Sequence, residues 1–318
     1  MARSGAPRRR IAPRELWEQR NATNLSLASQ QRLGSYRLLN VIMTGQTSQV
    51  WEAMDDSRQR RVAIKLLLSD YRRNREHIGY LKHEWEVGSK LDHPNVIHLF
   101  EFATKDGFPF IAMEYFPWPN LKQYINRGVE VLGYFAPKII ELCGEGLAYF
   151  NEQGWIHRDV KPDNFLMTDE ADIRLIDFAL GMKPKTGLAR LFAGKTKVQG
   201  TRSYMSPEQI RGQPLDQRAD VYSFACMAFE LLTGKLPYTG TSANDLLMKH
   251  IRAAPPNAEA ANRNITPETA QILQRAMAKK PDDRPESMSQ LLREFGSARI
   301  FKTTPPPPGS EDSTQDST

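Results

Sequence analysis

The residues best suited to chemistry lie in two short segments, WIHRDVKPDNFLM and LIDFALG. The first holds Asp159, Lys161 and Asn164 close together along the chain, and the second places Asp177 directly after an apolar run. Such a cluster is difficult to explain as protein core, because a buried charge without a partner is costly. The polar cluster therefore predicts a functional site.

The two segments resemble the catalytic loop of protein kinases, H-R-D followed by K and N, and the metal-binding D-F-G turn of that family. The resemblance extends in both directions, through VAIK ending at Lys65, a helical Glu84, LDHPNV, GTRSYMSPEQI and DDRPES. These motifs follow the family's order over roughly residues 36–295, with Ser-Pro-Glu where Ala-Pro-Glu is usual. The segment SPEQIRGQPLDQRADVYSFACMAFELLTGKLPYTG is most similar in sequence to bacterial members of the eukaryotic-type Ser/Thr protein kinase family.

The resemblance implies a role for four charged residues in phosphoryl transfer, which depends on positioning and charge neutralisation. Lys65 would hold the α- and β-phosphates of ATP and be steadied by Glu84. Asp159 would accept or orient the proton of the substrate hydroxyl, and Lys161 would neutralise charge on the transferred phosphate. A plain surface lysine is a poor alternative for Lys65, because its apolar neighbours in VAIKLLL indicate a buried sheet.

The resemblance also implies a metal site and a buried ion pair. Asn164 and Asp177 would give oxygen ligands to Mg²⁺, with Mn²⁺ as an alternative ion. Glu208 of SPE and Arg284 of DDRPES would pair and anchor the activation segment to the helical lobe, an architectural role. His157 of the H-R-D motif is expected to be a packing residue and not a general base.

The family likeness places the adenine of ATP between two lobes. Glu114 and Phe116 would hydrogen-bond it through their backbones, and apolar side chains would line the pocket. Simple core packing is an alternative for each lining residue. The predicted ATP-binding residues are Ile42, Gly45, Val50, Ala63, Lys65, Glu84, Met113, Glu114, Phe116 and Leu166.

The segment MTGQTSQV occupies the slot of the family's glycine-rich loop, because Val50 lies fifteen residues before Lys65. Met43 replaces the first glycine of that loop and Ser48 the third. Gly45 is then expected to be the residue free to adopt a positive φ. A further departure, not part of this loop, is Ala179 in the position of the D-F-G glycine.

The activation segment is expected to be switched by phosphorylation, with Thr196 as the site and Thr186 and Thr201 as competitors. Residues 181–199 carry lysines and an arginine but no acid. Without phosphate, the positive charge of this segment should repel Arg158, which precedes Asp159. A phosphate group would add negative charge and turn the repulsion into attraction. A merely flexible loop is the alternative, and Thr201 is a candidate for a direct role in the active site.

The elements that carry these motifs change type once along the chain. Five apolar segments between about residues 36 and 116 predict strands, interrupted by one helix in REHIGYLKHEWEVGSKL. In that helix Glu84 lies on the buried stripe and Glu86 points away from it. After Pro117 the patterns are helical. An α+β, bilobal protein-kinase fold is implied, with a small antiparallel sheet plus one helix before a larger helical lobe.

Composition favours a cytoplasmic protein with two polar tails. Cys143 and Cys226 fall in apolar helical patterns, which predicts core positions and a reducing compartment. No apolar run approaches the roughly 18 residues that span a bilayer. The predicted regions are a basic extension at 1–34, the N-terminal lobe at 35–116, the C-terminal lobe at 117–297 and a disordered Pro/Ser/Thr-rich tail at 298–318.

Two hypotheses of different class follow. The first is an ATP-dependent Ser/Thr protein kinase that acts on protein substrates, self-associates for trans-autophosphorylation and binds no nucleic acid. The second is a pseudokinase scaffold without turnover, suggested by Met43, Ser48 and Ala179. A kinase of small molecules is disfavoured, because GTRSYMSPE and the segment before it suit a peptide. Retention of every charged residue of the catalytic set favours the first hypothesis.

Overall fold

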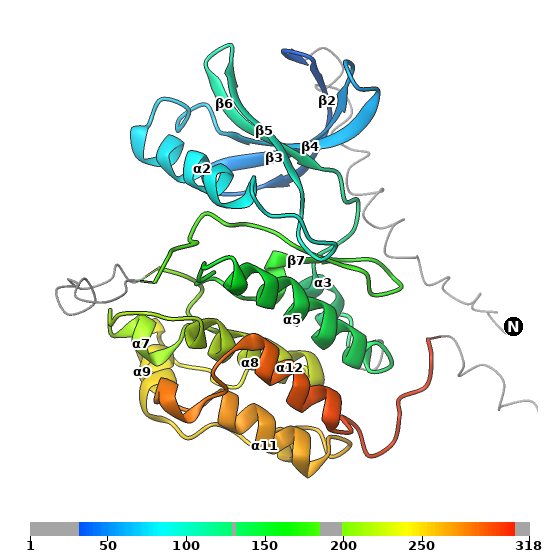
Figure 1. The fold of residues 1–318 in the computed structure, drawn as a ribbon, viewed down its shortest axis with the longest axis vertical. Coiled ribbons are helices and arrows are strands. Elements are labelled where there is room, and N and C mark those ends of the chain that lie inside the picture. The colour runs from blue at the N-terminus through cyan, green and yellow to red at the C-terminus, as the bar shows by residue number, and fades with distance from the viewer. Residues whose placement is uncertain (1–31, 129–131, 185–198, 309–318) are drawn as a thin grey trace, which may run out of the picture. The chain divides into compact units, whose positions relative to one another are not determined.

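The computed structural model describes residues 32–128, 132–184 and 199–308 and divides the chain into two compact units. The sheet unit comprises Met1–Leu81 with Leu99–Pro119, and the helical unit comprises Lys82–His98 with Asn120–Thr318. Both are coloured along the chain in Figure 1. The predicted α+β class, an antiparallel sheet followed by a helical part, is confirmed.

The sheet unit is built on an antiparallel sheet of six strands in the order β1-β2-β3-β4-β6-β5 (Figure 1). The turn Asp106-Gly107 between β5 and β6 has positive φ at both residues, which matches the twist of a hairpin. The strands are β1 (Arg32–Leu33), β2 (Tyr36–Thr44), β3 (Ser48–Asp55), β4 (Arg60–Leu67), β5 (Leu99–Lys105) and β6 (Phe108–Glu114).

One face of this sheet forms a compact apolar core because strand residues alternate between the two faces. On β4 the residues Val62, Ile64 and Leu66 point into it, whereas Lys65 lies on the opposite face. The buried members of the core are Leu33, Tyr36, Leu38, Ala53, Val62, Ile64, Leu66, Phe110 and Ala112. Leu33 belongs to the residues predicted as an extension, so the packed chain begins slightly earlier than expected.

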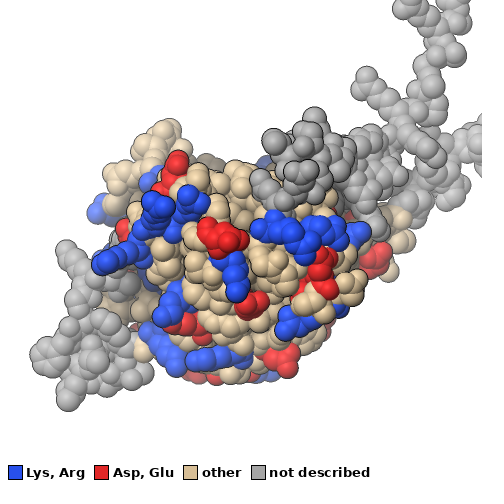
Figure 2. All heavy atoms as spheres, turned by 90° about the horizontal axis from the view of Figure 1, so that it is seen from above, with Lys and Arg blue, Asp and Glu red and all other residues tan. Residues whose placement is uncertain are grey.

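The exterior of the molecule mixes charges of both signs. On the face shown in Figure 2, basic and acidic side chains lie next to one another. Ion pairs of this kind in the sheet unit join Arg32 and Arg37 to Asp56, and Arg58 to Asp55. Across the described residues, no helix has the length and apolarity needed to cross a membrane.

The helical unit is organised around α8 (Arg218–Thr233), whose residues from Ala219 to Thr233 are all buried. A helix that is buried on every side must lie inside its domain. It packs against α5, α10, α11 and α12 (Figure 1). The other helices are α3 (Leu121–Ile125), α5 (Ala136–Glu152), α7 (Pro207–Ile210), α9 (Ala243–Arg252), α10 (Ala258–Ala261), α11 (Pro267–Ala276) and α12 (Met288–Ser297).

The polar cluster predicted from the sequence lies in and beside short elements between α5 and α7. They are the 3₁₀ turn η1 (Pro162–Asn164) and the hairpin of β7 (Phe165–Met167) and β8 (Ile173–Leu175). A second 3₁₀ turn, η2 (Pro281–Asp283), precedes α12. Helix α2 (Arg75–Gly88) spans the boundary between the two units, which falls between Leu81 and Lys82.

The packed chain continues past α12, beyond the boundary predicted at residue 297. The backbone N–H of Thr266 donates to the carbonyl of Ile300 at 3.1 Å, and that of Lys302 donates to Asn264 at 2.7 Å. Ile300 and Phe301 are both buried. This apolar pair precedes the proline run and has enough surface to bury, which explains why the packed chain extends past the predicted boundary.

Candidate active site

A buried carboxylate on α8 holds the catalytic loop. Asp220 is fully buried, and its Oδ2 accepts hydrogen bonds from the backbone N–H of His157 and from Nδ2 of Asn151, each at 2.8 Å. Its Oδ1 accepts the backbone N–H of Arg158 at 2.9 Å. Burial raises the pKa of Asp220, and the N–H donors oppose that rise. Asp220 is not among the predicted site residues, and its signal in the sequence is an acid in the first turn of an otherwise apolar helix.

His157 is a buried packing residue, as expected from the sequence. The side chain is 1% exposed and lies against the rings of Phe150 and Phe178, which stack on each other with centroids 5.7 Å apart. Phe178 belongs to the D-F-A turn, so these rings join the catalytic loop to the segment that carries Asp177. The imidazole is therefore part of an aromatic cluster inside the helical unit.

Asp159 lies at the centre of a hydrogen-bond network. Its Oδ1 accepts both the backbone N–H and the hydroxyl of Thr201, at 2.8 and 2.9 Å. Its Oδ2 lies 2.7 Å from Nζ of Lys161, and the same ammonium donates to the Thr201 hydroxyl at 2.8 Å. The carboxylate is thus held in one orientation by a cation and two neutral donors. Thr201, predicted as regulatory or as a direct participant, contacts both Asp159 and Lys161.

Asn164 completes the network from the other side. Its Nδ2 donates to the backbone carbonyl of Asp159 at 2.8 Å and to the Asp159 carboxylate at 3.3 Å. Because the donor end of this amide is engaged there, its Oδ1 points the other way. The backbone carbonyl of Asn164 accepts the N–H of Ile176 at 2.9 Å, which brings the residue before Asp177 beside the catalytic loop.

The described residues suit the Mg²⁺ ion that the family uses. An amide oxygen of Asn164 and the carboxylate of Asp177 are the hard oxygen ligands that Mg²⁺ prefers together with phosphate oxygens. Asp177 has a φ of 67°, as a left-handed residue, and its Oδ1 accepts the N–H of Ala179 at 3.4 Å. Ala179 is not among the residues with positive φ, so its side chain causes no backbone strain in the D-F-A turn.

The sheet unit presents Lys65 together with predicted nucleotide-binding residues. Lys65 on β4 lies opposite Val50 on β3, and Ala63 lies opposite Met113 on β6. Directly paired residues of antiparallel strands share a face, as do residues two apart along a strand. Val50, Ala63, Lys65 and Met113 therefore share the face opposite the apolar core. Glu114, the last residue of β6, pairs with Val62 and points to the other face of the sheet.

Ile42 and Leu166 are the remaining apolar positions predicted to bind the nucleotide. Ile42 lies in β2 at a register shift between Val41 and Met43, and it is half-buried. Leu166 lies in β7 of the helical unit, opposite Arg174 of β8. Phe116 follows β6 in the sheet unit and is also half-buried.

The β2–β3 turn corresponds to the predicted phosphate loop. The N–H of Gly45 donates to the carbonyl of Ser48 at 2.8 Å, which closes a tight hairpin. The φ of Gly45 is not positive, so this turn does not use the conformational freedom that the glycine has. Met43 lies in β2 opposite Val50 and is 53% exposed.

Two predicted partnerships stay predictions. Lys65 belongs to the sheet unit and Glu84 to the helical unit. Glu84 is buried while Glu86 is exposed, as the helical periodicity of α2 indicates. Thr196 lies outside the described residues. Its proposed partner Arg158 is 9% exposed and has a φ of 70°, and burial lowers the pKa of its guanidinium.

The predicted anchor of the activation segment is present. Arg284 donates two hydrogen bonds to Glu208, one to each carboxylate oxygen, inside the helical unit. A second anchor was not predicted: the hydroxyl of Tyr204 donates to buried Glu230 of α8 at 2.6 Å, and Lys122 of α3 pairs with the same carboxylate. Both anchors hold the segment that follows Thr201.

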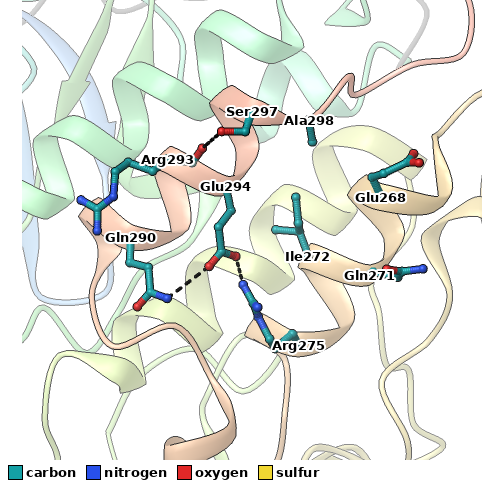
Figure 3. A pocket seen from close by; sticks show the side chains of 9 residues that line it. All are labelled: Glu268, Gln271, Ile272, Arg275, Gln290, Arg293, Glu294, Ser297 and Ala298. Carbon is teal, nitrogen blue, oxygen red and sulfur yellow. Dashed lines mark hydrogen bonds and ion pairs between the residues drawn. The ribbon is translucent and has the colours of Figure 1, made fainter.

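A separate hollow lies between α11 and α12 and contains none of the predicted site residues. Figure 3 shows that the side chains of Arg275 and Glu294 meet across it, with Ile272 beside them. Most of the residues that line it have polar side chains, and its volume is about 710 Å³. The lining residues are Glu268, Gln271, Ile272, Arg275, Gln290, Arg293, Glu294, Ser297 and Ala298.

Known proteins resemble this chain over most of its length. The family model described as "Protein kinase domain" matches residues 36–295. The chain is 33% identical over 266 residues to the serine/threonine-protein kinase PrkC of Bacillus subtilis, which covers 83% of this chain and 40% of that protein. It is 31% identical over 267 residues to the serine/threonine-protein kinase PknB of Mycolicibacterium smegmatis, covering 80% of this chain and 41% of the relative.

The alignment with a third relative covers a larger share of that protein. The serine/threonine-protein kinase PknA of Mycobacterium tuberculosis is 30% identical over 286 residues, covering 87% of this chain and 65% of that protein. The chain therefore spans less than two thirds of the length of each of these relatives. A family match of this extent agrees with the motifs and the geometry. The chain belongs to the protein kinase family.

Proposed function

We propose that this chain is a Ser/Thr protein kinase that transfers the γ-phosphate of ATP to Ser and Thr hydroxyls of proteins. The network of Asp159, Lys161 and Thr201 is the single observation that supports the proposal most strongly. It holds a carboxylate and an ammonium beside each other and fixes both through Thr201, with distances between 2.7 and 2.9 Å. Oriented charge of this kind is what phosphoryl transfer requires of a protein.

In the proposed reaction the acceptor hydroxyl attacks the γ-phosphorus and its proton passes to Asp159. The bond between the γ-phosphorus and the β,γ-bridging oxygen breaks, and ADP leaves with that oxygen. Lys161 stabilises the negative charge on the transferred group, and Lys65 holds the α- and β-phosphates. Asn164 and Asp177 would hold Mg²⁺, which when bound neutralises charge on the phosphates.

The names of the relatives support Ser and Thr as acceptors, since PrkC, PknB and PknA are each called serine/threonine-protein kinases. Thr201 supports the same choice, because its hydroxyl bridges Lys161 and the catalytic carboxylate. We further propose that the chain phosphorylates itself by self-association, and that Thr196 in the basic activation segment is the regulatory site, with Arg158 as its phosphate partner.

The test is incubation of the purified full chain with Mg-ATP, followed by mass spectrometry for phosphosites on the chain and on a mixed Ser/Thr peptide library. Asp159→Asn is the matched control, because it keeps the size of the side chain and removes the proton acceptor. We expect incorporation by the wild type and a loss of at least about a hundredfold in the control. Nucleotide binding without any incorporation would favour the scaffold hypothesis, which the departures at Met43, Ser48 and Ala179 suggest.

A further inference from the structure

Gln209 occupies a position that its side-chain chemistry explains and that the sequence motifs did not single out. It lies in α7 and is 1% exposed. Its Nε2 donates to two backbone carbonyls, that of Arg158 in the catalytic loop at 2.8 Å and that of Gln199 in the activation segment at 2.5 Å. One neutral NH₂ group thus joins two segments that are about forty residues apart in the chain.

The acceptor oxygen of the same amide does not contribute a hydrogen bond among the described residues. Within the described residues, Oε1 of Gln209 is buried and has no hydrogen-bond partner. A buried acceptor without a partner destabilises a fold, so an apolar side chain would be the better choice for packing alone. The two donated hydrogen bonds are therefore the feature that favours glutamine at this position.

Gly200 shows how closely the joined segments approach. It has a φ of +121°, and a Cβ added to it would lie 2.8 Å from the Arg158 carbonyl oxygen and 2.9 Å from Nε2 of Gln209. Only glycine allows this conformation together with this contact. The next residue is Thr201, whose N–H and hydroxyl reach Asp159. The position of Thr201 consequently depends on the way its two predecessors are held.

We propose that Gln209 is a positioning residue that fastens residues 199–201 to the catalytic loop, so that Thr201 keeps the Asp159 carboxylate in its reactive orientation. The backbone of Arg158 is then held on both sides of its Cα, the N–H by Asp220 and the carbonyl by Gln209. The proposal rests on the proposed kinase function for its kinetic consequence. Its structural part, the fastening of Thr201, does not need the chain to be active.

The structural part is tested by hydrogen exchange, read by mass spectrometry on peptides that cover residues 199–204. Gln209→Met removes both donors at similar volume. We expect faster exchange at the Thr201 amide in this variant, with an unchanged unfolding midpoint. Gln271→Met on the exposed surface of α11 is the control and should exchange as the wild type does. Equal exchange in wild type and Gln209→Met would overturn the proposal whether or not the chain transfers phosphate.

The kinetic part is tested by a double-mutant cycle with Thr201→Val. We expect Gln209→Met to lower kcat for peptide phosphorylation about tenfold and to leave the KM for ATP unchanged. If Gln209 acts through Thr201, the double variant should be no slower than Thr201→Val alone. Losses that multiply would mean that Gln209 acts independently, and the proposal would fail. A wild type without transfer would instead count against the proposed function, and hydrogen exchange would still decide the role of Gln209.

A pH series with Gln209→Glu separates positioning from general packing. The introduced carboxyl group faces two carbonyl oxygens, so it repels them when ionised and can donate one hydrogen bond when protonated. Burial beside those oxygens should raise its pKa. We expect its deficit in kcat relative to wild type to shrink from pH 8.5 to pH 6, whereas the deficit of Gln209→Met stays constant. A constant deficit in both variants, or loss of cooperative unfolding in both, would assign Gln209 a purely structural role.

Discussion

Arg284 binds the carboxylate of Glu208 through two parallel hydrogen bonds of 2.7 and 2.8 Å, and neither side chain is more than 5% exposed. The guanidinium also donates to the backbone carbonyls of Ala278 and Arg218, at 2.7 and 2.8 Å. The pair thereby ties α7 to the loop after α11 and to the start of α8. Such a fork needs the planar geometry of arginine, which lysine cannot reproduce.

Arg284→Met should therefore leave a buried carboxylate without its partner. We expect a loss of about 3–5 kcal/mol in the free energy of unfolding, measured by urea denaturation. Arg275→Met is the matched control, because Arg275 pairs with Glu294 on the surface and is half exposed. The control should change the free energy of unfolding by less than about 1 kcal/mol. Similar losses in the two variants would contradict the role assigned to the buried pair.

His250 should make the stability of the chain depend on pH. It is fully buried, with Nδ1 3.0 Å from the hydroxyl of Tyr222, and burial followed by the charge of Lys279 lowers the pKa of His250 to about 4. An unfolded histidine titrates near 6.5. Between these values the unfolded chain binds more protons, so the free energy of unfolding should fall as the pH falls from 6.5 to 4, by about 3 kcal/mol in total.

The measurement is urea unfolding of wild type and His250→Gln at several pH values between 4 and 8. Of the groups that face His250, Tyr222 and Tyr238 have raised pKa values and Lys279 has a pKa of about 8, so the effect of His250 is read between pH 4 and 6.5, below the titration of all three. The advantage of wild type over the variant should shrink toward pH 4. An advantage that is constant with pH would show that the histidine does not titrate as described.

Lys65→Met and Asp177→Asn should each reduce phosphoryl transfer by at least about a hundredfold, because both residues act on phosphate and metal positioning. Circular dichroism and the unfolding midpoint should stay near those of wild type. Removal of Mg²⁺ by EDTA should abolish transfer by wild type, and added Mg²⁺ should restore it. Turnover within a few-fold of wild type in either variant would remove the catalytic assignment of that residue.

The double variant Met43→Gly with Ser48→Gly should lower the KM for ATP and change kcat by less than about threefold. Side chains at these positions limit how closely the backbone N–H groups of the β2–β3 turn approach phosphate oxygens. Met43 is 53% exposed, so its removal takes little from the core. The check is an ATP titration at saturating peptide. A KM that stays the same or rises would mean that the native residues already fit the nucleotide.

Gly200→Ala should impair transfer without unfolding the chain. Its new Cβ would meet the Arg158 carbonyl at 2.8 Å, and the φ of +121° would be strained for alanine. We expect a fall in kcat of at least about tenfold. Gly154→Ala, also at a positive φ but with no atom within 4 Å of the added Cβ, is the control for backbone strain alone. Equal effects in both variants would mean that strain, and not the contact, is responsible.

Much of this architecture was predictable because periodicity and motif act locally. Cys143, predicted as a core residue of an apolar helix, is fully buried in α5, and strands β2 to β6 occur in the five predicted segments, with β1 lying before them. The family assignment was also predictable and is confirmed. Such features depend on residues a few positions apart or on a short sequence motif.

What could not be predicted depends on contacts between distant segments. Asp220 and Gln209 act on the backbone of the catalytic loop from 62 and 51 residues away, and no local pattern reports that. The φ of Gly45 was also left open by the residue type, and in the structure it is not positive. A glycine permits a conformation but does not require it.

The left-handed backbone at Arg158 and Asp177 has a consequence for engineering. Each non-glycine residue in that region costs about 1–2 kcal/mol, in a protein whose total stability is on the order of 5–15 kcal/mol. Selection for thermal stability alone should therefore accept glycine or asparagine at these positions, where the same side chains serve the active site. Heat tolerance and turnover would then compete for two residues of the catalytic machinery, and a stabilised variant should be screened for activity at these positions first.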